Sequence, residues 1–321
     1  MTPKNRSIFS LLLPALLLLL SAGCVRDAAA PEERQPENVC FVATMEGSGG
    51  TKATIHAAGP LSAGVPLGLV AYKYSTDNAD PGEWELHSSP AVVRAECDTR
   101  DDGITSRKWI PLHSQRLLWP REGYVRYFAF APHGAEGVTV NAADHAAPTI
   151  RYDVPAPAKQ IDLLVSSAAS TRQWDGDPAW RSIDVPLSLT HALTGVRFRV
   201  AEGVSVTHVR ISGVYSSGTL DLSAPQAWSP TTGNLGTYEL AGLSLGSGLH
   251  ADAQRPGFNL LDNDKVLFLL PQTLPAGAKV QATVVEGGTS KTLEDSIAGA
   301  VWQSGQMITY TVTGNKLGLK Y

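Results

Sequence analysis

Short alternating runs of apolar and polar residues dominate the chain after about its first forty positions. Residues 125–130 and 149–154 alternate in the first half, and residues 196–200 and 204–213 alternate more strictly in the second. Alternation with a period of two places one face of a strand on a core and the other in water. Glycine, proline and serine separate these runs, and no segment keeps a helical period over a useful length. The pattern predicts an all-β protein built as a sandwich or a barrel.

One polar interruption divides the strand candidates into two sets. Residues 168–184 contain glycine, proline and charged side chains, which predicts a link between domains. We therefore expect an N-terminal β-sandwich domain over residues 39–170 and a C-terminal β-sandwich domain over residues 186–321. The remaining strand candidates are residues 54–56, 65–72, 161–167, 218–222, 266–270, 279–285 and 307–312.

The start of the chain has the layout of a secretory signal. Lys4 and Arg6 precede an apolar run over residues 8–20, and small residues at 21–23 stand directly before Cys24. A charged start, an apolar stretch and small residues at a cleavage point define such a signal. The alternative is a transmembrane anchor, but the run is shorter than the roughly 20 apolar residues that span a bilayer.

A cysteine at this point resembles the signal of bacterial lipoproteins, in which the cysteine becomes the mature N-terminus and carries the lipid. The resemblance implies a signal peptide over residues 1–23 and lipidation at Cys24. Residues 24–38 are rich in alanine, proline and charge, which predicts a flexible tether. We expect the mature protein to work outside the cytoplasm, held to a membrane by its lipid.

Charge and motifs narrow the classes of function. The chain has 26 Lys and Arg against 30 Asp and Glu, a net charge of −4, without the basic clusters that bind nucleic acid. It lacks an HExxH or CxxC motif and a phosphate-binding loop. His133, Asp144 and His145 have no metal-ligand spacing. We expect no enzyme, no cofactor and no metal site, and we interpret His191 as a structural histidine bonded to the backbone.

Two further sets of residues leave alternatives open. Cys40 and Cys97 either pair in an oxidising compartment or lie as two separate buried thiols. Tryptophans either stack on sugars or partners, or seal a core. We place Trp119, Trp228 and Trp302 in the core.

An ordered set of short motifs resembles the fimbrillin family of Bacteroides-type bacteria. The set comprises the lipoprotein start, Thr51-Lys52-Ala53-Thr54, Trp119-Pro120 before an aromatic strand, residues 185–193 leading into 196–198, residues 211–214 and 218–222, Trp228, residues 268–275 and residues 302–306. It covers nearly all of the mature chain, most closely residues 185–312.

The resemblance implies two tandem transthyretin-like β-sandwich domains and a structural or adhesive role in surface fimbriae, without catalysis. In that family a lipidated precursor reaches the outer membrane, and an arginine-specific protease removes an N-terminal piece that includes the first strand. A strand of the next subunit then fills the groove. The implied partners are other fimbrial subunits, the outer membrane through the lipid anchor, and a host or bacterial surface receptor; nucleic acid is not among them.

The resemblance also selects candidate residues for assembly. Arg26, Arg34 and Lys52 are candidates for protease processing, and Lys52 stands where many relatives carry arginine. The candidates for strand exchange are Ile308, Tyr310, Val312, Leu317 and Leu319. The lysine and the short tail after residue 312 predict an accessory subunit at the tip or the anchor. The alternative function is a surface glycan-binding lipoprotein that uses Trp84 or Trp109.

Overall fold

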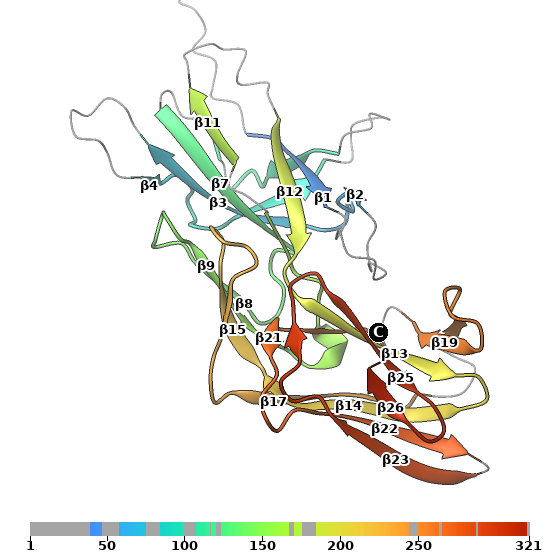
Figure 1. Ribbon diagram of the computed structural model, residues 1–321. Helices are drawn as coiled ribbons and strands as arrows, with labels where there is room; N and C mark the ends of the chain where they lie inside the picture. The colour runs from blue at the N-terminus through green and yellow to red at the C-terminus, as the bar shows by residue number, and fades with distance from the viewer. Residues whose placement is uncertain are drawn as a thin grey trace, which may run out of the picture. The chain divides into compact units, whose positions relative to one another are not determined.

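The regular secondary structure of the described residues consists almost entirely of β-strands. The computed structural model describes residues 39–46, 58–74, 84–98, 107–115, 117–119, 123–166, 170–174, 184–243, 249–262, 265–286 and 288–319. These residues belong to one compact unit, Glu37–Tyr321, and form 26 strands and one 3-10 turn, η1 (Pro157–Lys159) (Figure 1). The predicted all-β class is confirmed.

Seven strands from the first 191 residues close into a ring, which we call the N-terminal ring. In order of pairing they are β1 (Phe41–Met45), β12 (Val185–His191), β10 (Leu164–Ser166), β7 (Gly123–Ala131), β3 (Leu67–Tyr74), β5 (Val93–Cys97) and β6 (Trp109–Pro111), and β6 pairs with β1 again. Three short strands extend it: β2 (Gly59–Pro60) on β1, β4 (Glu85–Leu86) on β3 and β11 (Ser170–Trp174) on β7. The β1–β12 pair is parallel, whereas the other pairs of the ring are antiparallel.

The interior of the N-terminal ring is an apolar core. Strand alternation sends every second side chain inward. The buried side chains include Phe41, Leu69, Trp109, Tyr127 and Leu187. The ring therefore buries one face of each strand, as the alternating patterns predict.

Two sheets pack face to face in the C-terminal part. One contains β18 (Leu249–Ala251), β19 (Phe258–Leu261), β13 (Thr194–Ala201), β25 (Met307–Val312) and β26 (Leu317–Leu319), with β20 (Leu267–Leu269) on β13. The other contains β17 (Leu235–Ala241), β14 (Ser205–Tyr215), β22 (Lys279–Glu286) and β23 (Thr289–Ser296). Their inner faces share one core, to which Phe198, Ile211, Val280 and Tyr310 contribute. Two short strands, β21 (Gln272–Thr273) and β24 (Val301–Trp302), pair with each other and form a separate two-stranded sheet.

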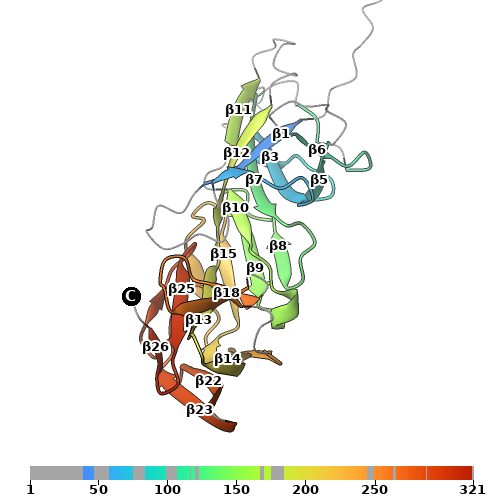
Figure 2. The same cartoon turned by 90° about the vertical axis from the view of Figure 1, so that its right-hand side faces the viewer.

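A third sheet combines strands from both halves of the sequence. It contains β8 (Val138–Asn141), β9 (Thr149–Asp153), β15 (Ser217–Asp221) and β16 (Trp228–Pro230) (Figure 2). Its inner face shares a core with the outer face of the ring, where Val70 and Phe128 meet Ile150 and Leu220.

Strand pairings thus cross the boundary predicted between residues 170 and 186. Strand β12 follows that boundary yet pairs with β1 and β10, and β9 precedes it yet pairs with β15. The segment predicted as a link contains β11, which pairs with β7. The division into domains of residues 39–170 and 186–321 stays a prediction, and any cut there separates strands that are hydrogen-bonded in the structure.

Candidate assembly site

Strand β1 is the first described strand, and it completes the N-terminal ring. It lies parallel to β12 in a register that pairs Phe41 with Val185 and Met45 with Leu189. The Val185 N–H donates to the Cys40 carbonyl at 2.8 Å, and the Glu46 N–H donates to the Leu189 carbonyl at 2.8 Å. On its other side β1 meets β6 at Trp109. The strand therefore fills a slot between two neighbours.

Strand β1 also fills part of the ring's core. The side chains of Val39, Phe41 and Ala43 are at most 1% exposed. The Phe41 ring packs edge-on against Tyr127, with 5.2 Å between ring centroids. Burial of a valine or phenylalanine side chain contributes about 1.5–3 kcal/mol. Removal of β1 would open an apolar groove and leave backbone groups of β12 without partners.

The chain turns back on itself after β1. The Leu61 N–H donates to the Ala43 carbonyl at 3.0 Å, and Pro60 of β2 pairs with Thr44. The candidate processing residue Lys52 comes between β1 and β2 in sequence, outside the described residues. Cys24, Arg26 and Arg34 also lie outside the described residues. Cleavage at Lys52 would cut the chain between β1 and the rest of the ring.

The C-terminal candidates for strand exchange divide between a central and an edge strand. Ile308, Tyr310 and Val312 are buried in β25, which pairs with β13 on one side and with β26 on the other. The buried Leu317 belongs to β26, the last strand of that sheet, and Leu319 ends the same strand. Strand β25 therefore lies inside its own sheet, with a neighbour on each side. Strand β26 is the member of the set that lies at a sheet edge.

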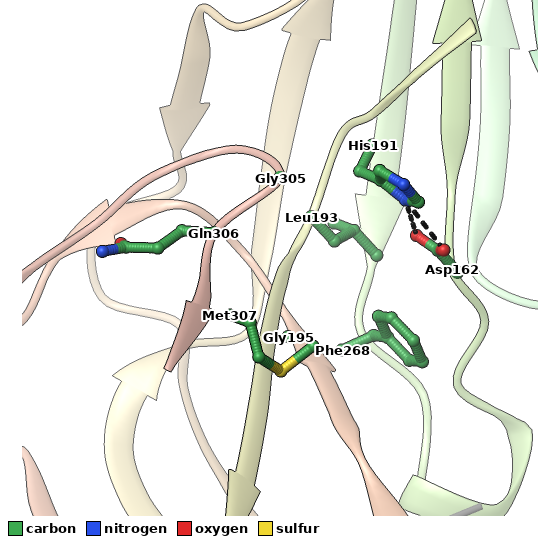
Figure 3. Close-up of a pocket in the computed structure, with 8 residues that line it drawn as sticks. All are labelled: Asp162, His191, Leu193, Gly195, Phe268, Gly305, Gln306 and Met307. Atoms are coloured by element: carbon green, nitrogen blue, oxygen red, sulfur yellow. Dashed lines mark hydrogen bonds and ion pairs between the residues drawn. The ribbon is translucent and has the colours of Figure 1, made fainter. Parts of the chain in front are cut away.

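A histidine–aspartate pair occupies the point where the chain passes from the ring to the C-terminal sheets. The Nδ1 atom of His191 lies 2.9 Å from Oδ2 and 3.0 Å from Oδ1 of Asp162 (Figure 3). Burial lowers the pKa of His191, but the hydrogen bond and charge of Asp162 outweigh it, so the pKa is raised. The partner of Nδ1 is thus a carboxylate and not the backbone group expected from the sequence. The sequence did not indicate this pairing because Asp162 and His191 are 29 positions apart.

The cavity beside this pair is too small for a substrate. Its volume is about 20 Å³, which holds about one water molecule. The other lining residues are Leu193, Gly195, Phe268, Gly305, Gln306 and Met307, none of which carries a nucleophilic group (Figure 3). The pair therefore has the geometry of a structural contact and not of a general base with a reacting partner.

A comparison with known families identifies the chain. The sequence profile of the fimbrillin-like family matches residues 51–320. The chain belongs to the fimbrillin-like family. No curated protein matches the chain.

Several solved structures are similar to this fimbrillin-like protein. A candidate cell adhesion protein from Bacteroides uniformis shares 18% identity with a TM-score of 0.49, over 88% of this chain and 97% of that one. A fimbrial assembly protein from Parabacteroides distasonis shares 13% identity with a TM-score of 0.40, over 88% and 92% of the two chains. The fimbrial anchor protein Mfa2 from Porphyromonas gingivalis shares 10% identity with a TM-score of 0.40, over 89% and 95%.

Family membership confirms the resemblance that the sequence motifs indicate. It supports a fimbrial or adhesion subunit, a structural protein of the cell-surface fimbrium whose partners are other fimbrial subunits. In the described ranges no helix is long and apolar enough to span a membrane. Those ranges also hold no cluster of three or more His, Cys, Asp or Glu side chains suited to a metal ion.

The tryptophans of the fimbrillin-like chain divide between core and surface. Trp119 and Trp302 are buried as expected, and Trp228 is half-buried with its Nε1 donating to the Ala192 carbonyl at 2.7 Å. Trp109 is buried, and its Nε1 donates to the Val65 carbonyl at 2.9 Å. Trp109 is therefore not available for stacking on a sugar, whereas the half-buried Trp84 lies near the surface.

The two cysteines of the folded part are not joined to each other. Cys40 on the chain before β1 and Cys97 at the end of β5 are thiols rather than a disulfide. Burial is the main reason that the pKa of the Cys97 thiol is raised. Of the two alternatives left open by the sequence, the structure has separate thiols.

Proposed function

We propose that this fimbrillin-like protein is an accessory subunit, at the tip or the anchor of surface fimbriae, and that it joins its neighbours by strand exchange. In this proposal a lipid on Cys24 holds the protein to the outer membrane. A receptor on a host or bacterial surface is a further partner. The observation that carries the proposal is the position of β1, a buried strand that directly precedes the candidate processing segment.

The contacts of β1 support its role as the exchanged strand. It contributes Phe41 and Ala43 to the ring core, together with Val39 just before it, and pairs with β12 along its whole length. A strand from another subunit that offers apolar side chains at alternate positions would restore both the backbone bonds and the core. This is β-augmentation, in which main-chain bonds give affinity and side-chain pockets give specificity. Before exchange the ring leaves no open edge between β12 and β6.

The lysine at position 52 favours an accessory position. A protease that requires arginine would not cut at Lys52, and an uncut subunit keeps β1 in its groove and accepts no strand. A subunit that accepts no strand ends a polymer rather than extending it.

The first experiment tests whether β1 can be exchanged. The full chain is cut with a lysine-specific protease and mixed with a labelled peptide of residues 37–48. A control peptide carries Phe41→Asp and Ala43→Asp, which would bury two carboxylates. We expect the cut protein to bind the native peptide at least about tenfold more tightly than the control, and the uncut protein to bind neither. Equal binding of both peptides, or no binding by the cut protein, would refute exchange of β1.

The second experiment tests β26 as a donated strand. Deletion of residues 316–321 removes β26 but leaves β25 and its pairing with β13 in place. The matched control deletes only Lys320 and Tyr321, beyond the end of β26. If β26 is donated, the longer deletion yields a folded subunit that fails to co-purify with sheared fimbriae. Normal incorporation would remove the donor role from this strand.

Mass spectrometry of the mature N-terminus from native cells tests processing directly. A mature chain that starts at Cys24 with lipid mass, and that remains uncut at Lys52, fits an anchor that only donates. A chain that starts just after Lys52 fits a subunit whose groove accepts a strand. A chain that starts neither at Cys24 nor just after Arg26, Arg34 or Lys52 would contradict all of the candidate sites.

A further inference from the structure

An aromatic patch lies on the outer face of the N-terminal ring, at the corner where β4, β3 and β7 run side by side (Figure 1). It comprises Tyr74, Trp84, Leu86, Tyr124 and Arg126. The register explains why these side chains share a face. Tyr72 is paired with Arg126 on β7 and with Leu86 on β4. Tyr74 lies two positions further along β3 and is paired with Tyr124. Paired residues and residues two positions apart point to the same face of a sheet, so these side chains all lie on the face of Tyr72.

The rings of the aromatic patch contact one another directly. The Tyr74 ring lies 5.5 Å from that of Trp84 and 6.2 Å from that of Tyr124. The guanidinium carbon of Arg126 sits 4.5 Å from the centre of the Trp84 ring. Leu86 is 43% exposed, and the other four side chains are half-buried. Packing of each ring against the next holds the patch in one arrangement that is open to solvent.

Among the residues that the structure describes, no carboxylate neutralises the charge of the aromatic patch. In the described part of the chain Arg126 has no carboxylate partner; it stacks on Trp84. Glu85, between Trp84 and Leu86 on β4, points to the opposite face and pairs with Lys73 at 3.4 Å. A stacked guanidinium keeps its N–H edges available for two parallel bonds to a carboxylate. In a protein of net charge −4, the described part of this patch presents a local positive charge.

We propose that the aromatic patch binds a glycan that contains uronic acid residues. Tyrosine and tryptophan rings offer flat apolar surface with a polar group at the end, which suits the face of a sugar ring. Arg126 would pair with the sugar carboxylate, and the hydroxyls of Tyr74 and Tyr124 would bond to sugar hydroxyls. A stable protein interface engages about 20–30 residues a side. Five side chains match a few sugar units better than a folded partner.

The test uses isothermal titration of the full chain with a galacturonic acid trisaccharide. The comparison ligands are a galactose trisaccharide, which lacks the carboxylates, and a short poly-glutamate peptide, which carries carboxylates without sugar rings. We expect the galacturonic acid trisaccharide to bind at least about tenfold more tightly than either comparison ligand. The Arg126→Gln protein should lose at least about tenfold in affinity for it, because the bidentate charge pair is gone.

Two further variants separate binding from folding. Arg151→Gln removes an exposed arginine of β9 that pairs with Asp153, away from the patch, and should bind like the native chain. Tyr124→Ala removes a ring without touching the Trp84–Arg126 stack and should weaken binding several-fold at an unchanged melting temperature. Three results would each overturn the proposal: no binding at millimolar ligand, equal binding of the Arg126→Gln and native proteins, or a preference for poly-glutamate. The test does not involve strand exchange, so its outcome is independent of the proposed assembly.

Discussion

Phe41 and Tyr127 meet edge-on across the interior of the N-terminal ring, with their ring planes at 82°, although β1 and β7 are not neighbours in the ring. The contact spans the core from one wall to another. It ties the first strand to β7, which itself pairs with β3, β10 and β11. The pair therefore couples retention of β1 to the packing of the ring as a whole.

The first prediction concerns Phe41. Replacement by alanine leaves a cavity against Tyr127, and we expect it to lower the free energy of unfolding by about 3–5 kcal/mol. Val42→Ala on the same strand changes a half-buried side chain on the other face and should cost less than about 1.5 kcal/mol. Urea denaturation of both variants measures the difference. Equal losses would mean that β1 is not held by its inward face.

The second prediction concerns pH and the pair of His191 with Asp162. A histidine whose pKa is raised on folding adds stability below the unfolded pKa, and this is lost as pH rises through the folded value. The Asp162→Asn variant should therefore lose most stability on the acidic side of neutrality, by about 1.5–3 kcal/mol, and less above it. Thermal melts of native and variant protein between pH 5 and 9 measure this. A loss that is constant over that range would contradict the charged pair.

The third prediction concerns the buried ion pair of Arg199 and Asp252. The Arg199 Nε donates to the Asp252 carboxylate, which also accepts from the Gln254 N–H. Arg199→Met alone leaves the buried Asp252 carboxylate without its arginine and should lower the free energy of unfolding by about 3–5 kcal/mol. Arg199→Met combined with Asp252→Asn should cost clearly less than the sum of the single changes. Arg151→Met, in an exposed pair, is the control and should cost less than about 1 kcal/mol. Additive losses would show that the two groups do not interact.

The fourth prediction concerns a fragment of residues 186–321. It keeps the two packed C-terminal sheets but loses β8 and β9, so β15 loses a partner and Leu220 loses its cover. We expect a strand-rich circular dichroism spectrum, a lower melting temperature than that of the full chain, and binding of a hydrophobic dye. A mainly helical spectrum would contradict the fold. A melt identical to the full chain, without dye binding, would contradict the role of the third sheet.

The fifth prediction concerns the lipid on Cys24. Replacement of Cys24 by alanine should abolish incorporation of labelled fatty acid, because the residue that carries the lipid is gone. The protein should also leave the membrane fraction, because it loses the buried acyl chains that anchor it. Replacement of Cys40, which follows the tether, is the matched control and should leave the label unchanged. Label that survives Cys24→Ala would refute the lipoprotein signal.

Alternation along the chain is a good guide to which segments form strands. Residues 196–200, 279–285 and 307–312 were expected as strands and correspond to β13, β22 and β25. Each alternates or is wholly apolar, and the signal is local, so it can be read without knowledge of partners. Strand β11 was missed because residues 170–174 are polar and their pairing with β7 is set by the rest of the ring.

Pairing between distant segments could not be predicted in the same way. The parallel contact of β1 with β12 joins residues more than a hundred positions apart. Neither strand carries a sequence signal that indicates its partner. The same holds for Asp162 beside His191 and for Tyr74 beside Tyr124. The sequence therefore predicted assembly residues near Lys52 and the C-terminus. The neighbours of β1, which are β12 and β6, are known only from the closed ring.

The parallel slot of β1 has a kinetic consequence for the proposed assembly. An incoming strand would replace the backbone bonds of β1 one for one, so the two end states differ little in bonding. The speed of polymer growth would then depend on how fast β1 escapes from between β12 and β6, because Phe41 must leave the core before anything can enter. Hydrolysis of the chain beyond β1 would make that escape irreversible by letting the released peptide diffuse away. The packing of the Phe41 ring would thereby set the rate of fibre growth.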